Sequence, residues 1–337
     1  MSIKIAVDAM GGDFAPLEIV KGSVLAAREY NIPVLLVGQV DKINAELNKY
    51  DVSGLDIQVV KADEVIEMCE APGSAIRRKK DASIVVAVDQ VAKGNAQALV
   101  AAGSTGAAMA ASLFGLGRLP GISRPAIAVV LPTTDKPVVL LDAGANSECE
   151  PENLYQFAIM GSAFSSKVIG AENPRVGILN IGGESGKGNT LAQDTYKLFA
   201  SRDNSTINFV GNVEGREMFS GICDVVVCDG FVGNVTLKVT EGVASMIISQ
   251  FKEQLYSSLL AKIGAWIAKP ALMKLRQKTD YNEYGGALLL GIKGTCVISH
   301  GSSKAIAIKN AIKVAKESVE KDVNGKISRL NESNKLC

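Results

Sequence analysis

The stretch "AQALVAAGSTGA", residues 96–107, decides the fold class. It begins with an apolar run that lacks the polar alternation of a half-exposed strand, so it predicts a strand buried on both faces. The Gly-Ser-Thr-Gly sequence at 103–106 predicts a tight turn, and the small apolar residues after it predict a buried helix. Residues 95–117 carry no charge, but small residues dominate them, so they do not predict a transmembrane span.

The same order of buried strand, glycine turn and helix recurs along the chain. Further runs of this kind are "KIAVDAMGGD", "IPVLLVGQ", "AIAVVLP", "PVVLLDAGAN", "RVGILNIGGE", "INFVGNVEG" and "DVVVCDGFVGN". This repetition predicts an α/β fold with a doubly wound, mostly parallel sheet. Ligands of such sheets bind at the carboxyl ends of the strands. Polar residues gather at those ends, and we therefore expect several of the loops to meet at one rim.

The 337 residues are predicted to form a single α/β domain over 1–320, with a protruding helical segment at about 250–280 and a polar tail at 321–337 that we expect to fray. Within 254–278 the sequence has the only Trp and five basic residues but no acidic one. This pattern favours a helix at a membrane surface about as much as an ordinary core or dimer helix. Pro270 is expected to end one helix and start a second. The apolar residues at helical spacing are Leu255, Leu259, Ile263, Trp266 and Ile267.

Composition and charge exclude several classes of function. A net charge of +1 argues against nucleic-acid binding, because phosphate neutralisation needs a basic excess. The six cysteines show no CxxC spacing and there is a single histidine, so no metal site is predicted. The N-terminus lacks the apolar stretch of a signal peptide, and free thiols fit a reducing compartment, so a cytoplasmic location is expected.

Two glycine-rich loops are candidate anion sites. The 103–106 turn offers backbone N–H groups and two hydroxyls to a phosphate; the alternative is a plain helix cap. The loop "IGGESGKGNT", residues 181–190, resembles a nucleotide-binding P-loop but lacks its first glycine and its metal-binding hydroxyl. It therefore favours an anion held by Lys187 without a metal ion, and its alternative is a flexible loop with a solvated lysine.

Further polar residues follow buried strands. Asp142 and Asn146 lie in "LDAGAN" and Asp229 and Asn234 in "CDGFVGN", where carboxylates orient donors and amides stabilise an oxyanion; ordinary Asp-Gly turns are the alternative. The lone His300 lies on a glycine-serine loop and is a candidate general acid or donor. The basic run "SAIRRKKDAS" at 74–83 could dock an acidic protein or be a solvated face.

Eight motifs, in order from the first strand to about residue 316, resemble the phosphate acyltransferase family of bacterial phospholipid synthesis (the PlsX family). They are "VDAMGGDFAP", "AGSTGA", "ISRPAIA", "LDAGAN", "LNIGGESGKGN", "FVGNVEGRE", "DVVVCDGFVGNVTLK" and "YGGALLLG…HGSS". The sequence departs from the family at Phe14, where the family usually has His, and at Ser104, where it usually has Asn.

The resemblance implies a three-layer α/β/α sandwich similar to phosphotransacetylase and isocitrate dehydrogenase-like folds. It implies reversible transfer of a long-chain acyl group from acyl carrier protein to inorganic phosphate, without a cofactor. The resulting acyl phosphate would be used by a membrane enzyme that acylates glycerol 3-phosphate. It further implies a homodimer that associates peripherally with the membrane from the cytoplasm.

On this interpretation each candidate residue has a hypothetical role. Asn234 or Asn212 would hold the oxyanion, Asp229 would orient these donors, and His300 would protonate the departing thiolate. The 254–278 residues named above would contact the membrane or the acyl chain. The phosphate ligands would be Gly103, Ser104, Thr105, Gly106, Arg124 and Lys187, and the other substrate contacts would be Asp8, Gly11, Gly12, Asp13, Asp142 and Asn146.

Three other functions remain open from the sequence. A phosphotransacetylase would use a short acyl group on coenzyme A, and donor preference distinguishes it. A non-catalytic phosphate or nucleotide sensor would bind tightly without turnover, although the chain lacks GxGxxG followed by an acidic residue. A membrane-peripheral scaffold would leave the polar strand ends without a use.

Overall fold

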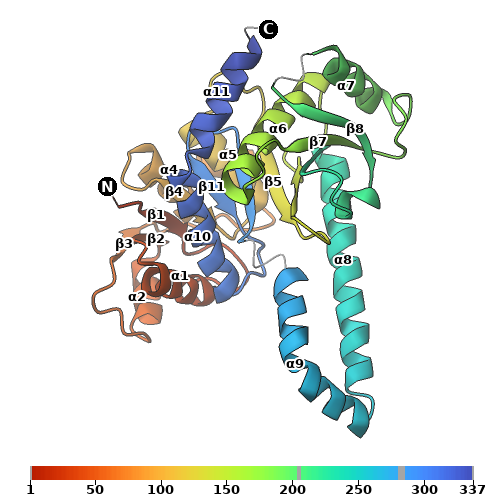
Figure 1. Ribbon diagram of the computed structural model, residues 1–337. Coiled ribbons are helices and arrows are strands. Elements are labelled where there is room, and N and C mark those ends of the chain that lie inside the picture. Colours follow the sequence, from red (N-terminus) through yellow and green to blue (C-terminus); the bar gives the residue numbers. More distant parts are fainter. Residues whose placement is uncertain (1, 203–205, 280–284, 336–337) are drawn as a thin grey trace.

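The computed structural model describes residues 2–202, 206–279 and 285–335. The strands in these residues form one sheet with helices on both faces (Figure 1). In chain order the strands are β1 (Ile5–Asp8), β2 (Val34–Gly38), β3 (Ile57–Lys61), β4 (Ala98–Ala101), β5 (Ala126–Leu131), β6 (Val138–Leu141), β7 (Arg175–Asn180), β8 (Asn208–Glu214), β9 (Val225–Val227), β10 (Ala287–Leu290) and β11 (Thr295–Ile298).

The helices follow strands in most of the chain, as the repeated sequence pattern predicts. They are α1 (Leu17–Tyr30), α2 (Val40–Leu47), α3 (Pro72–Arg78), α4 (Ser83–Ala92), α5 (Thr105–Leu116), α6 (Pro151–Phe164) with the π-helical turn η1 (Ser165–Ile169), α7 (Thr190–Ser201), the 3₁₀ turn η2 (Glu217–Phe219), α8 (Gly230–Leu255), α9 (Leu259–Thr279), α10 (Ala305–Glu320) and α11 (Val323–Lys335).

The sheet contains two parallel blocks that run in opposite directions. Its strand order is β3-β2-β1-β4-β11-β10-β5-β6-β9-β7-β8. Strands β3, β2, β1, β4 and β11 form the first block, and β6, β9, β7 and β8 form the second. Between them β10 is antiparallel to both β11 and β5, and β5 is antiparallel to β6. The predicted mostly parallel sheet is confirmed, with the carboxyl ends of the two blocks pointing in opposite directions. Loops from both blocks nevertheless line one cleft, as expected.

Apolar side chains alternate between the two faces of the sheet and build a core on each. On one face α1, α6, α7, α10 and α11 cover strand residues such as Ile5, Val7 and Val139. On the other, α3, α4 and α5 cover the first block through residues such as Ala6 and Leu99. The strand runs have no polar alternation because most strands are buried on both sides, whereas the edge strands β3 and β8 are partly exposed. The predicted three-layer α/β/α arrangement is confirmed.

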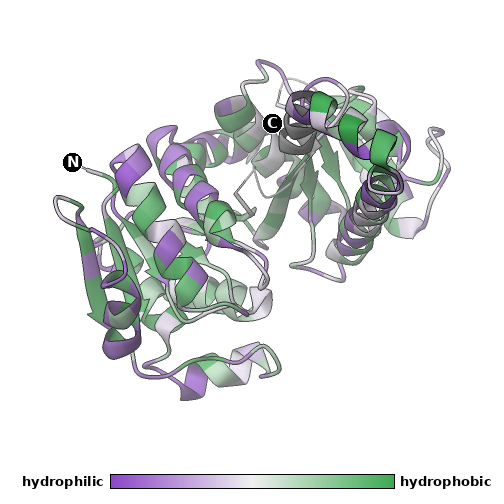
Figure 2. Ribbon diagram, turned by 90° about the horizontal axis from the view of Figure 1, so that it is seen from below, coloured by the Kyte–Doolittle hydropathy of each residue, from purple (hydrophilic) through white to green (hydrophobic). Residues whose placement is uncertain are grey.

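Helices α8 and α9 form a hairpin that extends away from the sheet (Figure 1). Pro270 lies inside α9, so the predicted helix boundary there is wrong; the chain reverses at residues 256–258 instead. By length and composition α8 could cross a membrane, yet its first turn is buried in the fold at Gly230 and Gly233. In Figure 2, which views the hairpin from its free end, hydrophobic residues lie along both helices.

The C-terminal segment differs from the expected frayed tail, since residues 323–335 form α11. Val323 and Ile327 are part of the core and Asn331 is also buried. These residues recur at a spacing of four, so they lie on one helical face. The polar residues between them obscure that apolar stripe in the sequence.

Candidate active site

Three loops at the carboxyl ends of β1, β4 and β11 are joined through their backbones. A Cβ atom at Gly11 would lie 2.9 Å from the backbone nitrogen of Gly103. The N–H of Asp13 donates to the carbonyl oxygen of Gly301 over 2.8 Å. Glycine is required where backbones approach this closely. The three loops therefore pack against one another through main-chain atoms.

Asp8 contacts the first of these loops, the one that follows β1. It is buried, and its Oδ1 accepts a hydrogen bond from the N–H of Met10 over 3.1 Å. Burial raises the pKa of Asp8, although hydrogen bonds from Ser83 and from the backbone of Met10 and Gly11 oppose the shift. Its position behind Gly11 indicates that Asp8 shapes the turn after β1.

A cleft of about 380 Å³ opens between α5 and α8, over the central strands β5, β10 and β11. It lies on the face where helices cover the two blocks but leave the antiparallel centre exposed. Ile127, Val129 and Ile298 give it an apolar floor, with Met109 and Leu237 on its walls. Pockets of this size and apolar character are typical of substrate sites.

The first turn of α5 lines one end of the cleft through Gly103, Thr105 and Gly106. Ser104 caps the helix, because its Oγ accepts a hydrogen bond from the N–H of Ala107 over 3.3 Å. The N–H groups of Thr105 and Gly106 have no carbonyl partner in helical geometry. Together with the positive end of the helix dipole they favour an anion. The capping interpretation and the anion interpretation of this turn are thus compatible.

His300 lines the same end of the cleft. Its Nδ1 accepts a hydrogen bond from the backbone N–H of Ser302 over 3.2 Å and lies 2.8 Å from the Ser302 hydroxyl. A neutral imidazole with Nδ1 as acceptor carries its proton on Nε2. His300 therefore provides an N–H donor at the cleft.

The opposite wall begins with a buried carboxylate network. Asp142 Oδ1 accepts hydrogen bonds from the N–H groups of Ile127 and Ala145, and its Oδ2 accepts one from the N–H of Asn146 over 2.7 Å. Burial raises the pKa of Asp142 despite these donors. The side-chain amide of Asn146 donates to Asp142 and to the carbonyl of Pro125. Both residues shape the loop rather than line the cleft.

This network positions the start of α8. Asp229 Oδ1 accepts a hydrogen bond from the N–H of Val232 over 2.9 Å and caps the helix. The N–H of Gly230 donates to the carbonyl of Asn146 over 2.7 Å. Asn234, one turn later, lines the cleft beside Gly144. Asp229 thus fixes the start of the helix that carries Asn234; its role in orienting the Asn234 amide stays a prediction.

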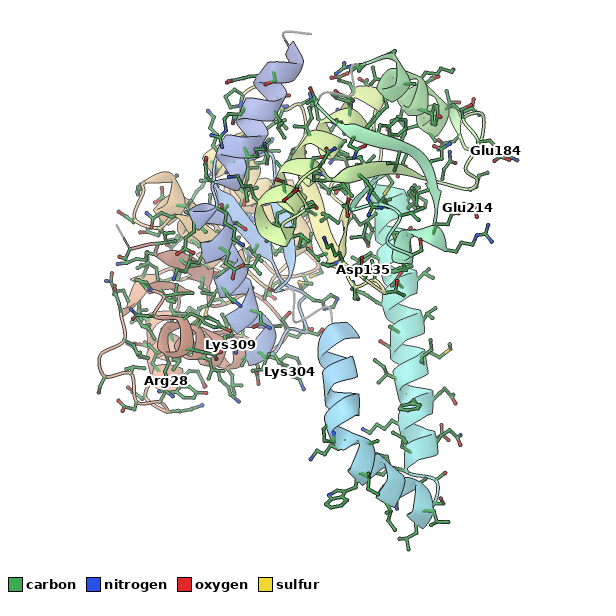
Figure 3. The ribbon with its side chains drawn as sticks, in the orientation of Figure 1. Arg28, Asp135, Glu184, Glu214, Lys304 and Lys309 are labelled. Carbon is green, nitrogen blue, oxygen red and sulfur yellow. The ribbon has the colours of Figure 1, made fainter. Side chains whose placement is uncertain are left out.

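Arg124, Asn212 and Lys187 also lie outside this cleft. Arg124 is exposed and donates to the carbonyl of Glu148 over 3.1 Å. The amide of Asn212 donates to the carbonyl of Glu184 over 2.8 Å, so it anchors the loop after β7 instead of facing an oxyanion. Figure 3 shows Glu184 on the outer side of the second block. Lys187, on the same loop, is exposed and forms no ion pair with the described residues; its phosphate role stays a prediction.

The cleft also contains residues that the sequence analysis missed. Lys238 follows Asn234 by four residues, and the helical spacing places both side chains on one face. Ser299 directly precedes His300 and is buried at the cleft. Met68 lies at the mouth with 58% of its surface exposed. Only the helical register of "NVTLK" could have indicated Lys238, because a lone lysine or serine carries no signal by itself.

The chain matches known proteins over nearly its whole length. A family model described as "Fatty acid synthesis protein" matches residues 3–326. Phosphate acyltransferases from Pelotomaculum thermopropionicum and Halothermothrix orenii are 55% and 51% identical to it, covering 94% and 97% of this chain and 92% and 98% of their own. A phosphotransacetylase structure from Streptococcus pyogenes superimposes with a TM-score of 0.59 at 16% identity, covering 95% of this chain and 94% of its own. This last likeness confirms the predicted fold, and the family match, with the two relatives, shows that the chain belongs to the fatty acid synthesis protein family.

Proposed function

We propose that the chain is an acyltransferase that transfers a fatty acyl group from a thioester to inorganic phosphate and releases acyl phosphate. The observation that carries this proposal is the cleft, where anion donors on α5 face the Asn234 amide across an apolar floor. The name of the relatives, phosphate acyltransferase, supports the same reaction.

The chemistry needs no nucleophilic side chain. An oxygen of hydrogen phosphate attacks the thioester carbonyl carbon, a C–O bond forms, and the C–S bond then breaks. The proton that hydrogen phosphate loses ends on the departing thiolate, so charge and atoms balance. A thiolate with an ordinary pKa of about 8.5 leaves readily. The cysteine thiols are also unsuited to act as nucleophiles, because burial raises the pKa of Cys149 to about 11 and that of Cys223 to about 12.

Each residue of the cleft has a different proposed role in this reaction. The N–H groups of Thr105 and Gly106 hold the phosphate, and Lys238 adds a positive charge at the cleft. The Asn234 amide donates to the carbonyl oxygen as negative charge develops there, a contact worth about 3 kcal/mol when well aimed. The Nε2–H of His300 donates to the departing sulfur. Alignment of the reactants supplies up to about 7 kcal/mol more.

We assign a long-chain acyl thioester of acyl carrier protein as the donor. The apolar floor and the exposed Met68 at the mouth support a long alkyl chain that enters from that side. The basic helix α3 lies beside the cleft, because a Cβ atom at Gly106 would contact Pro72. Exposed Arg77 on α3 and exposed Lys80 in the turn after it would face an acidic carrier. The acyl phosphate would then serve the membrane enzyme that acylates glycerol 3-phosphate.

The hairpin supports a homodimer at the membrane surface. Along α8, Val239, Val243 and Met246 are exposed, and a second copy of the chain would cover them. At the tip, Leu259, Leu260 and Trp266 are each more than three-quarters exposed, with Lys262 nearby. Apolar side chains flanked by lysines suit the interface of an anionic membrane. The protein would thus be cytoplasmic and peripherally bound.

The test is a hydroxylamine trap for acyl phosphate. Purified protein is incubated with inorganic phosphate and either palmitoyl carrier protein or acetyl-coenzyme A. We expect phosphate-dependent hydroxamate from the carrier-protein donor. Product from acetyl-coenzyme A alone would instead indicate a phosphotransacetylase, and bound phosphate without product from either donor would indicate a sensor.

A further inference from the structure

Glu241 brings a carboxylate to the cleft that the proposed reaction does not use. It lies on α8, where spacings of three, four and seven residues place Leu237, Lys238 and Glu241 on the same face as Asn234. All four residues line the cleft. The Glu241 side chain forms no hydrogen bond or ion pair with the described residues. Its carboxylate is therefore available to a substrate.

The position of Glu241 along α8 places it at the outer end of the cleft. The first turn of the helix is buried at Gly230 and Gly233, and the helix then leaves the sheet (Figure 1). Glu241 follows Asn234 by seven residues, which corresponds to about 10 Å along the helix axis. It is half-buried and lines the cleft. Glu241 therefore borders the cleft where α8 leaves the fold.

The charge of Glu241 limits the groups that it binds. An ionised carboxylate only accepts hydrogen bonds, so its partner must be a donor. Phosphate is unsuitable because like charges repel each other, and an alkyl chain has no donor. The remaining part of an acyl thioester is the arm beyond the sulfur. In acyl carrier protein and in coenzyme A this arm is pantetheine, which has a first and a second amide N–H and a hydroxyl group.

The length of pantetheine fits the distance along α8. In an extended arm the second amide nitrogen lies about 9 Å from the sulfur. With the thioester carbonyl at the Asn234 amide, an arm that follows α8 brings this N–H to Glu241. Leu237 lies between them in the helix and offers an apolar contact to the methylene groups of the arm. The acyl chain then lies over the apolar floor on the other side of the carbonyl.

We propose that the Glu241 carboxylate accepts a hydrogen bond from the second amide N–H of the pantetheine arm of the acyl donor. This inference rests on the proposed function, because it takes the thioester carbonyl at Asn234 as its starting point. It makes Glu241 a substrate-binding residue that contributes to the affinity for the donor and not to the affinity for phosphate. The hydrogen bond is charge-assisted and therefore stronger than one between neutral groups.

The test compares two donors that differ in the length of the arm. Decanoyl-pantetheine has both amides, whereas decanoyl-N-acetylcysteamine ends after the first. We expect Glu241→Ala to raise the KM for decanoyl-pantetheine about tenfold, and to leave kcat, the KM for phosphate and the KM for the short donor within about twofold. Glu253→Ala is the matched control, since Glu253 is an exposed glutamate of α8 that does not line the cleft. We expect it to change none of these values.

The two donors also define the contrary results. An equal effect of Glu241→Ala on both donors, or no effect on either, would overturn the inference. Decanoyl carrier protein and decanoyl-coenzyme A identify the source of the arm. We expect the increase in KM with the carrier-protein donor, and an increase with the coenzyme A donor alone would assign the arm to coenzyme A.

Binding without turnover separates this inference from the proposed function. S-decyl-pantetheine has a thioether in place of the thioester and cannot transfer its chain, so calorimetry measures its Kd directly. Glu241→Ala should raise this Kd about tenfold and leave the Kd of S-decyl-N-acetylcysteamine unchanged. If the wild type makes no acyl phosphate but this difference is found, the proposed function fails and the inference stands. If the wild type makes acyl phosphate and the difference is absent, the inference fails and the proposed function stands.

Discussion

The side-chain amide of Asn234 lies against the backbone of Gly144, so that a Cβ atom at position 144 would be 3.1 Å from Asn234 Nδ2. Gly144 also has a φ of +132°. Gly144→Ala is therefore expected to displace the amide and to lower kcat at least tenfold, with little change in the KM for phosphate. Steady-state hydroxamate assays measure both. Gly215→Ala, at a glycine with open space around it, is the control, and equal kcat values in the two variants would contradict the role of Asn234.

Lys187 provides a test of the loop after β7. If its ammonium group reaches the phosphate, Lys187→Ala raises the KM for phosphate about tenfold, because a charge-assisted hydrogen bond is lost. Lys197→Ala, on α7 and paired with Asp194 at the surface, is the matched control. An unchanged KM for phosphate in Lys187→Ala would show that Lys187 does not bind phosphate and that only the donors of the cleft do.

Gly11 is expected to tolerate no side chain. A Cβ atom there would lie 2.7 Å from Asp8 Oδ2 and 2.9 Å from the nitrogen of Gly103, and neither neighbour is free to move. We expect Gly11→Ala to lower the free energy of unfolding by about 1–3 kcal/mol and to abolish most activity. Denaturant unfolding measures the first effect. Gly73→Ala, in α3 with nothing within 4 Å of the new methyl, should be neutral or slightly stabilising; equal losses in both variants would refute the backbone contact.

The Arg175–Asp224 pair predicts a pH dependence of stability. Burial raises the pKa of Asp224, but hydrogen bonds from the backbone and guanidinium of Arg175 outweigh this, so the pKa lies below 3.8. A lowered folded-state pKa stabilises the protein above pH 3.8, and this contribution is lost as the pH falls further. Asp224→Asn should therefore be less stable than the wild type at pH 6, and the difference should shrink at pH 3.5.

Urea unfolding at the two pH values checks this, with Asp194→Asn, which removes an exposed pair on α7, as the control. A constant difference between Asp224→Asn and the wild type would show that the carboxylate charge is unimportant.

The hairpin tip predicts membrane binding. Leu259 is 77% exposed, and a charge there should oppose insertion into the lipid interface. Leu259→Glu should reduce sedimentation with anionic vesicles at least fivefold and leave transfer from a soluble donor unchanged. Leu17→Glu, at an exposed leucine on α1, should bind vesicles as the wild type does. Normal sedimentation of Leu259→Glu would contradict the membrane assignment.

Local structure could be predicted from the sequence to a large extent. In "DVVVCDGFVGN" the apolar run is β9 and Asp229 caps α8, because burial and capping depend on a few adjacent residues. The direction of β10 and β5 could not be predicted in the same way. Strands that are buried on both faces are uniformly apolar whether their neighbours are parallel or antiparallel.

The composition of the site depended on the order of the strands, which the sequence does not reveal. Thr105, Asn234 and His300 meet in the cleft as expected, whereas Lys187, in the loop after β7, and Asn212, within β8, do not line it, because β7 and β8 are the last two strands at one edge of the sheet. Lys238 was missed because only the folded helix shows that it lies at the cleft, one turn after Asn234.

The position of β11 between β4 and β10 has a consequence for biosynthesis. As the nascent chain leaves the ribosome, the backbone groups on one edge of β4 stay unpaired until β11, the last strand of the described residues, is synthesised. An unpaired apolar edge invites association with other chains. Chains released before residue 295 should therefore aggregate or bind chaperones, whereas chains that extend through β11 close the sheet.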